Sequence, residues 1–372
     1  MNDKCTFNDH MNKKKLQNFQ DDIKFTPSPT FRSFGRIINN NISNGNHHNN
    51  YHSSSSSRFH IHSLMSSNNL PSGICDIDNK YAKTNPNYDA TYARVIDHAR
   101  HNREHLCIIN NPENIFNDGE KLKKFFQPHL TLKQRNTTID WIIELASSEL
   151  DMSSSSIFLA VQILDIMSSI LPMDGQEFAL VGMVSLLLAG KIEEICPPSP
   201  DLLVKLVASA YSVDDIVRTE QTIVENLSFE LLLPTRNLFL PRILLAAEMK
   251  GREIILANFI MEISLQDYML NQYPPGQIAA ASVHLARQML ISPNDQIWTP
   301  SLVYYSSYNE HELVLITKRL RSVYWRVVIS KEDRPPTYCR YDIPEQLHVA
   351  SACQALRSQD LRYDQDYNHL KI

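Results

Sequence analysis

Glycine, clustered cysteine and catalytic signatures are all scarce in this 372-residue sequence. It contains only 9 glycines, which favours helices over a fold of many turn-linked strands. Its six cysteines are scattered and form no CxxC pair or Cys/His cluster, so neither a metal site nor a disulfide framework is expected. No phosphate-cradling glycine loop or nucleophile–base motif is present. These absences predict that the protein is not an enzyme and holds no metal and no cofactor.

Membrane and nucleic-acid partners are also disfavoured. The uncharged apolar run at residues 178–190 is too short to span a bilayer, and residues 1–20 lack the apolar core of a signal peptide. The formal net charge is −5, and the acidic excess lies after residue 88, where a phosphate-binding surface would need cations. We therefore expect a soluble intracellular protein with no membrane partner and no nucleic-acid partner.

The two ends of the chain differ in composition from its middle. Residues 1–88 are rich in Asn, Ser and His, with runs at 39–41 and 53–57, and cannot bury enough apolar surface to offset the entropy of ordering. This segment is predicted to be a disordered regulatory tail. Residues 330–372 are predicted to form a polar C-terminal tail, in which Pro335-Pro336 argues against a helix.

The middle of the chain shows helical periodicity that occurs twice. Five helices precede Pro234 and five follow it, and the third of each set, at 178–190 and 276–290, is apolar and rich in small residues. Leu188-Ala189 in the first half corresponds to Leu285-Ala286 in the second. The expected fold is all-α, with two five-helix repeats at 131–233 and 234–329. Residues 89–130 are assigned to an N-terminal helix and connector.

Several ordered segments resemble the cyclin family. Residues 180–198, which read LVGMVSLLLAGKIEEICPP, resemble the core of the cyclin box. Asp140-Trp141 matches its first helix, and Pro274-Pro275 with residues 298–302 resembles the C-terminal fold of mitotic cyclins. Residues 127–131 resemble the segment that precedes the box in A-type cyclins, so the A type is favoured over the B type within the mitotic A/B group. The resemblance implies tandem cyclin folds.

The resemblance also implies a function. A cyclin is the regulatory subunit that binds a cyclin-dependent protein kinase and seats its helix C, whose position controls phosphoryl transfer. The switch requires that the cyclin bind the active arrangement of the kinase better than the inactive one. For this chain the resemblance implies control of progression through S, G2 and M phases, in the nucleus and the cytoplasm.

Two residues match the family's polar anchors for the kinase. Lys191 would donate to main-chain carbonyls of the kinase, and Glu220 would accept from main-chain N–H groups. A lysine near a helix C-terminus can also serve only the helix dipole, and the matching Glu220 favours the anchor interpretation. The resemblance places four apolar residues around them, namely Leu188, Ile192, Phe229 and Leu231.

The residues that line a substrate-docking groove in many cyclins are degenerate here. Gln134, Thr137 and Thr138 stand where that family carries apolar residues, whereas Trp141 and Glu144 remain. Trp141 alone is better explained as a core residue than as a docking surface. We therefore expect weak recognition of leucine-containing docking motifs.

Arg135 and Asp165 resemble the family's internal ion pair between the first two helices. Such a pair is weak evidence for net stability, although removing one partner leaves a buried charge without its counterion. We assign this pair a structural role.

The N-terminal tail contains a partial match to a cyclin destruction box. Arg32, Gly35, Ile37 and Asn39 recur in the expected order, but Phe34 replaces the usual leucine and Arg32 lies one residue too close. The resemblance implies recognition by ubiquitin-ligase machinery through this tail.

Two other functions share the architecture, because a fold alone does not determine a function. A transcription factor built from tandem cyclin folds would show a basic face on the second repeat and usually an N-terminal zinc ribbon. A non-activating scaffold would bind the kinase without switching it on.

Overall fold

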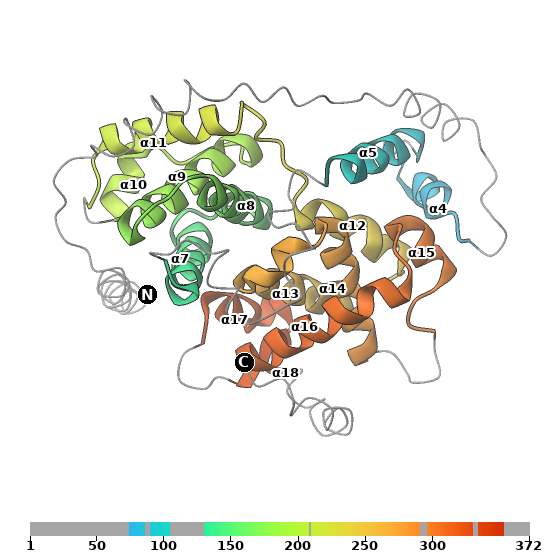
Figure 1. Cartoon of the computed structure of the whole chain (residues 1–372). Coiled ribbons are helices and arrows are strands. Elements are labelled where there is room, and N and C mark those ends of the chain that lie inside the picture. The colour runs from blue at the N-terminus through green and yellow to red at the C-terminus, as the bar shows by residue number, and fades with distance from the viewer. Residues whose placement is uncertain are drawn as a thin grey trace.

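The computed structural model describes residues 74–85, 90–104, 130–207, 210–290, 296–329 and 334–352 (Figure 1). Within these ranges every regular element is a helix, and the predicted all-α fold with two five-helix repeats is confirmed. The first repeat contains α7 (Leu132–Glu144), α8 (Ser154–Ile170), α9 (Gly175–Glu193), α10 (Pro200–Leu206) and α11 (Val213–Asn226). The second contains α12 (Arg236–Ala246), α13 (Arg252–Ile263), α14 (Pro275–Leu290), α15 (Pro300–Ser306) and α16 (Glu310–Ile329).

Short polar signals set where the helices begin. Thr131 accepts a hydrogen bond from the backbone N–H of Gln134, whose side chain accepts from the N–H of Thr131, a capping box that starts α7. The fourth helices of the two repeats begin alike, because Ser199 caps α10 and Thr299 caps α15, each followed by a proline. The duplicated order of helices is therefore accompanied by duplicated capping chemistry.

Helix α9 lies at the centre of the first repeat. Every residue from Phe178 to Gly190 is buried, and a Cβ added at Gly182 would lie 3.0 Å from the methyl group of Thr138 on α7. Glycine therefore permits α7 to approach closely. Residues 175–193 are long and apolar enough to cross a membrane by length and composition, but 72% of that window is buried inside the protein, as expected for a core helix.

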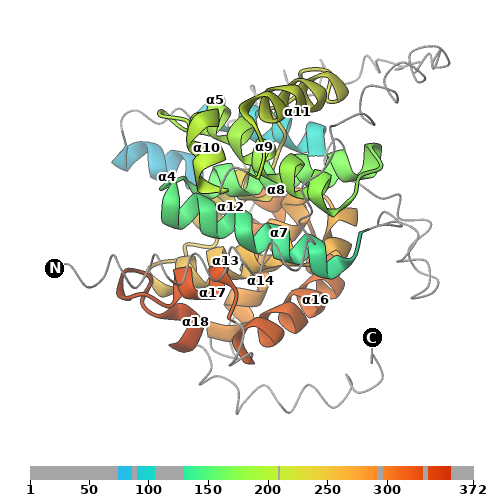
Figure 2. The same cartoon turned by 90° about the vertical axis from the view of Figure 1, so that its left-hand side faces the viewer.

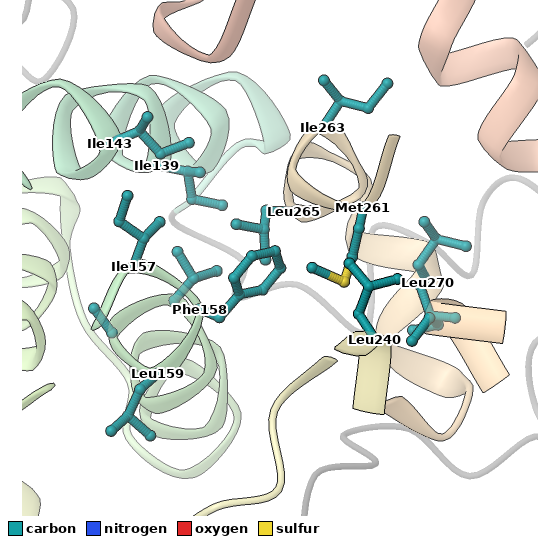
Figure 3. Packing of buried hydrophobic residues seen from close by; sticks show 14 of the residues in the cluster. Ile139, Ile143, Ile157, Phe158, Leu159, Leu240, Met261, Ile263, Leu265 and Leu270 are labelled. Atoms are coloured by element: carbon teal, nitrogen blue, oxygen red, sulfur yellow. The ribbon is translucent and has the colours of Figure 1, made fainter. Parts of the chain in front are cut away.

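The two repeats share one continuous apolar core (Figure 3). Phe158 on α8 points from the first repeat towards Leu265, which follows α13 in the second. Three short helices of other types continue this region, namely η3 (Leu145–Glu149), a π-helix that follows α7, and the 3-10 helices η4 (Ser264–Gln266) and η5 (Tyr268–Gln272), which follow α13. Because the core crosses the junction, the repeats pack as one body.

The N-terminal boundary needs a correction. The prediction that residues 1–88 are disordered is wrong for residues 74–85, where Asp76 caps α4 (Ile77–Thr84). This helix and α5 (Ala90–Arg103) lie beside α12 and α15 of the second repeat (Figure 1). The partial destruction box, Arg32, Phe34, Gly35, Ile37 and Asn39, lies outside the described residues and stays a prediction.

The C-terminal prediction also needs a correction. Pro335-Pro336 does not prevent a helix, because Pro336 occupies the first position of α17 (Pro336–Tyr341), where its missing N–H has no partner to lose. Helix α17 contacts α7 and α13, and α18 (Val349–Ala352) contacts α13 as well (Figure 2). A short turn, η6 (Pro344–Gln346), connects them. Residues 334–352 are thus part of the folded body.

Candidate functional site

The last turn of α9 and the middle of α11 meet at an ion pair. The Lys191 ammonium donates to a carboxylate oxygen of Glu220. Their side chains are 41% and 20% exposed, so both remain accessible from solvent. The structure therefore brings together the two residues that the sequence indicated as polar anchors.

The end of α9 is held in place by tight packing around Gly190 and by hydrogen bonds to the carboxylate of Glu194. A Cβ at Gly190 would lie 2.9 Å from Pro198 and from Met152, so only glycine fits beside Lys191. The Glu194 carboxylate accepts from the backbone N–H of Ser153 at 2.7 Å and from the Ser156 hydroxyl at 2.6 Å. Burial raises the pKa of Glu194, but these hydrogen bonds outweigh it and lower the pKa overall. The backbone that carries Lys191 is thereby fixed before any partner binds.

The chain that follows α11 has an unusual backbone. Ser228 and Phe229 have φ angles of 50° and 62°, in the left-handed region that is costly for residues with a side chain. This conformation lets the Phe229 N–H donate to the Val224 carbonyl at 3.0 Å and turns the ring outward, where 76% of the residue is exposed. Leu232 is 68% exposed in the same segment. Two large apolar side chains thus face solvent directly after α11.

The predicted apolar residues divide into two groups. Leu188 is buried in the core, with 3% exposed, and so presents little surface to a partner. Ile192 and Leu231 are half-buried, and Phe229 is exposed. The sequence did not indicate two further exposed apolar residues, Leu232 and the fully exposed Ile195. No local sequence pattern distinguishes a solvent-facing leucine or isoleucine from a buried one.

The Arg135–Asp165 ion pair is present in the structure, and it has more hydrogen-bond partners than the sequence predicted. Arg135 donates to both carboxylate oxygens of Asp165, at 2.7 and 2.6 Å, with both side chains buried. Arg135 also donates to the Leu265 carbonyl, and Asp165 accepts from Asn271, whose side-chain oxygen accepts from Arg236. Since Leu265, Asn271 and Arg236 belong to the second repeat, the pair links both repeats rather than only α7 and α8.

The degenerate docking residues do not form one exposed surface. Gln134 is engaged in the capping box of α7, and Thr137 is half-buried. Thr138 is completely buried against Gly182, so its hydroxyl does not face a peptide. Trp141 packs against the core as a half-buried residue, and Glu144 is half-buried as well. The weak docking of leucine-containing motifs stays a prediction.

No group of three or more His, Cys, Asp or Glu side chains in the described part of the chain is arranged to hold a metal ion. His284 lies buried on α14, with Nδ1 3.0 Å from the Thr317 hydroxyl and Nε2 3.1 Å from a Glu310 oxygen. Both nitrogens therefore have partners, as expected for a core histidine.

Comparison with known proteins agrees with this architecture. Residues 108–232 match the family described as "Cyclin, N-terminal domain", and residues 234–354 match "Cyclin, C-terminal domain". Cyclin-A1-4 of Oryza sativa subsp. japonica is 30% identical over 256 residues, which is 68% of each chain. Cyclin-B2-1 of Arabidopsis thaliana is 33% identical over 200 residues, 54% of this chain and 46% of the relative. The G2/mitotic-specific cyclin cdc13 of Schizosaccharomyces pombe is 34% identical over 194 residues, 52% of this chain and 39% of cdc13.

The sequence alignments and the superposition with a solved structure both relate this chain to cyclins. Against the Arabidopsis and fission-yeast relatives the match spans less than half of the relative's length. The X-ray structure of a viral cyclin from herpesvirus saimiri superposes with a TM-score of 0.51 at 18% identity, covering 61% of this chain and 96% of the viral one. Because both cyclin domains match in order and a curated cyclin is 30% identical over 68% of each chain, this chain belongs to the cyclin family.

Proposed function

We propose that this cyclin binds a cyclin-dependent protein kinase and activates it by holding the kinase's helix C inward, as part of cell-cycle control. Membership of a family with A- and B-type relatives supports a regulatory role. The observation that carries the proposal for a site is the accessible Lys191–Glu220 pair, with exposed apolar residues in the segment directly after α11.

The physical task is to shift an equilibrium of the kinase. Phosphoryl transfer needs a Lys–Glu ion pair and a correctly placed helix C, which the isolated kinase populates poorly. Moving a two-state equilibrium from 1:99 to 99:1 requires a partner that prefers the active state by about 5.5 kcal/mol. The cyclin surface must therefore supply several strong contacts that exist only with the active arrangement.

The site can supply contacts of that size. A charged side chain that hydrogen-bonds to a backbone group contributes about 1.5–3 kcal/mol, so Lys191 and Glu220 together match much of the requirement. Their mutual ion pair holds both groups in position before binding, which lowers the entropy cost of ordering them. Burying Phe229 and Leu232 would each add about 1.5–3 kcal/mol.

The test replaces both anchors by alanine, Lys191→Ala with Glu220→Ala, in the full chain. The second repeat provides a matched control, because the side chains of Gln288 on α14 and Arg321 on α16 also link the third and fifth helices, with a 2.7 Å hydrogen bond. Binding to purified cyclin-dependent kinases is measured by calorimetry, and activation by phosphorylation of a histone-like substrate. We expect about a hundredfold weaker binding for the anchor variant and near-normal binding for Gln288→Ala with Arg321→Ala.

The controls separate function from folding. Lys191→Ala with Glu220→Ala should lose only about 0.5 kcal/mol of stability per substitution, since both side chains are accessible to solvent. Gln288 and Arg321 are half-buried, so the stability of the control variant is measured by chemical denaturation alongside its binding. Normal binding and activation by the anchor variant would place the kinase interface elsewhere on the cyclin. Tight binding of the unmodified protein without any gain in kinase activity would instead identify a scaffold.

A further inference from the structure

The outward face of α16 in the second repeat combines cations with exposed apolar side chains. Leu315 is 61% exposed and Ile329 is 46% exposed, and both lie on this face together with the exposed residues Lys318, Ser322 and Arg326. The five positions follow the three- and four-residue spacing of one helical stripe. With a rise of 1.5 Å per residue, the stripe from Leu315 to Ile329 is about 21 Å long.

The acidic and basic residues of α16 lie in different parts of the helix. Its two acids, Glu310 and Glu312, lie in the first turn, and its cations all follow, from Lys318 to Arg326. Arg319 pairs with Asp267 at 2.6 Å, and Arg321 donates to Gln288, so these two flanking cations are engaged within the fold. Within the described residues, neither Lys318 nor Arg326 has an acidic partner within ion-pair distance.

The equivalent helix of the first repeat has the opposite character. Helix α11 carries four acids and one arginine, whereas α16 carries two acids and four cations. Cations near a helix C-terminus are favoured by the helix dipole, which accounts for Arg326. The dipole does not account for Leu315 and Ile329, the large apolar residues exposed at the two ends of the stripe, whose burial by a partner would be favourable.

We propose that the outward face of α16 is a second docking surface, which binds an acidic amphipathic segment of a partner protein. Such a segment would place apolar side chains on Leu315 and Ile329 and carboxylates opposite Lys318 and Arg326. Charge complementarity favours an acidic peptide, because opposed potentials steer association and exclude wrong partners. A nucleic acid fits less well, since phosphate binding needs more cations and gains nothing from apolar ends. This surface lies on the second repeat and is independent of the anchors Lys191 and Glu220.

The probe is a fluorescent 18-residue alanine-based helical peptide that carries two leucines 14 residues apart, with glutamates between them on the same face. Its binding to the full chain is measured by anisotropy at 0.05 and 0.5 M salt. We expect saturable binding that weakens with salt, because the distance beyond which exposed charges are screened falls from about 14 Å to about 4 Å over this range. A matched peptide with glutamine in place of glutamate should bind at least about fivefold more weakly.

Three variants locate the contact. Lys318→Glu with Arg326→Glu should weaken binding of the acidic peptide about tenfold or more. Leu315→Ser with Ile329→Ser should weaken it about tenfold at both salt concentrations, because apolar burial is not screened. Lys205→Glu with Arg218→Glu reverses two exposed cations of the first repeat and changes the net charge equally, and should alter binding less than twofold.

The proposal would be overturned if binding of the acidic peptide did not saturate, or if both charge-reversal variants lost binding equally. It would also be overturned if the serine variant bound normally, or if a duplex DNA bound more tightly than the peptide and Lys318→Glu with Arg326→Glu abolished the binding of both. Melting temperatures of all variants should match that of the unmodified protein. Kinase activation should be unchanged in the α16 variants, so failure of this proposal is distinct from failure of the proposed kinase interface.

Discussion

The two repeats share a five-helix fold but differ in what covers them. In both, the third and fifth helices are linked by a side-chain bond near the end of the third, Lys191–Glu220 in the first repeat and Gln288–Arg321 in the second. The first pair is a full ion pair beside an exposed apolar segment, whereas the second pair is an amide–guanidinium bond. The second repeat is also covered by α4 and α5 and by α17 and α18, which lie far from each other in sequence (Figures 1 and 2).

Buried polar contacts attach the N-terminal helices to the second repeat. The Asp78 carboxylate accepts from Arg94 of α5 at 3.0 Å and from Arg242 of α12 at 2.8 Å. The Glu104 carboxylate, directly after α5, accepts from the backbone N–H of Gly276 and from the Tyr308 hydroxyl, both at 2.8 Å. Burial raises the pKa of Glu104, and these hydrogen bonds oppose the rise. The added helices therefore cover α12 and α15 of the second repeat, a contact that the duplicated five-helix fold alone does not provide.

The largest effect is expected where the repeats are joined, at Arg135. Arg135→Ala should cost about 3–5 kcal/mol of the free energy of unfolding, because it leaves Asp165 buried without its cation. Chemical denaturation measures the loss. The control, Arg103→Ala, removes an exposed pair with Glu230 at 3.9 Å and should cost far less. Similar losses in the two variants would show that the repeats do not depend on this junction.

The next effect concerns the C-terminal cover of the second repeat. Tyr341 is buried, lies 5.3 Å from the Phe259 ring and donates to the buried Glu262 carboxylate. Tyr341→Ala should cost about 3 kcal/mol because it leaves a cavity and removes a partner of Glu262. Tyr304 is 39% exposed, and Tyr304→Ala should cost about 0.5 kcal/mol. Equal stability of the two variants would mean that α17 is not part of the cooperative fold.

The smallest effect is a pH dependence of the free energy of unfolding that arises from His284 in the second repeat. Burial lowers the pKa of His284, against the opposing influence of Glu310, while Arg287 and Arg321 lower it further. The unfolded chain then binds more protons than the folded one below pH about 6.5, so this contribution to stability is present at pH 7 and above and is lost as the pH falls. Unfolding titrations between pH 5 and 8 should show a shallower dependence in His284→Gln. An unchanged slope would indicate that the imidazole titrates as it does in water.

Local sequence signals predicted much of the fold. The small, apolar segment around Gly182 predicted a helix surrounded by helices, and its burial confirms this because a stripe that is apolar on all sides has no solvent-facing side. The resemblance to the cyclin family also predicted the Arg135–Asp165 pair and indicated Lys191 and Glu220 as anchors, but it did not predict that these two residues bind each other.

The errors occurred where long-range contacts override composition. The polar segment around Asp78 lacks apolar residues for a core of its own, and it is helical because Arg94 and Arg242 bind its buried carboxylate. Pro336 is a different case, because its tolerance at the first position of a helix is a local property that the prediction of a non-helical tail did not consider. Leu188 was expected at a partner surface but lies in the core.

The amino-acid sequence by itself determined the helices, their duplication and the residues that cap several of their starts, because helical periodicity and capping are local properties. Only the tertiary structure decided which surfaces are open. Phe229 faces solvent because the chain turns through two left-handed residues after α11. Parts of α12, α13 and α15 are covered because α4 and α17 pack against them, whereas the outward face of α16 stays exposed. Solvent exposure is a property of the whole packed chain, since a side chain is buried only when a residue distant in sequence arrives to cover it.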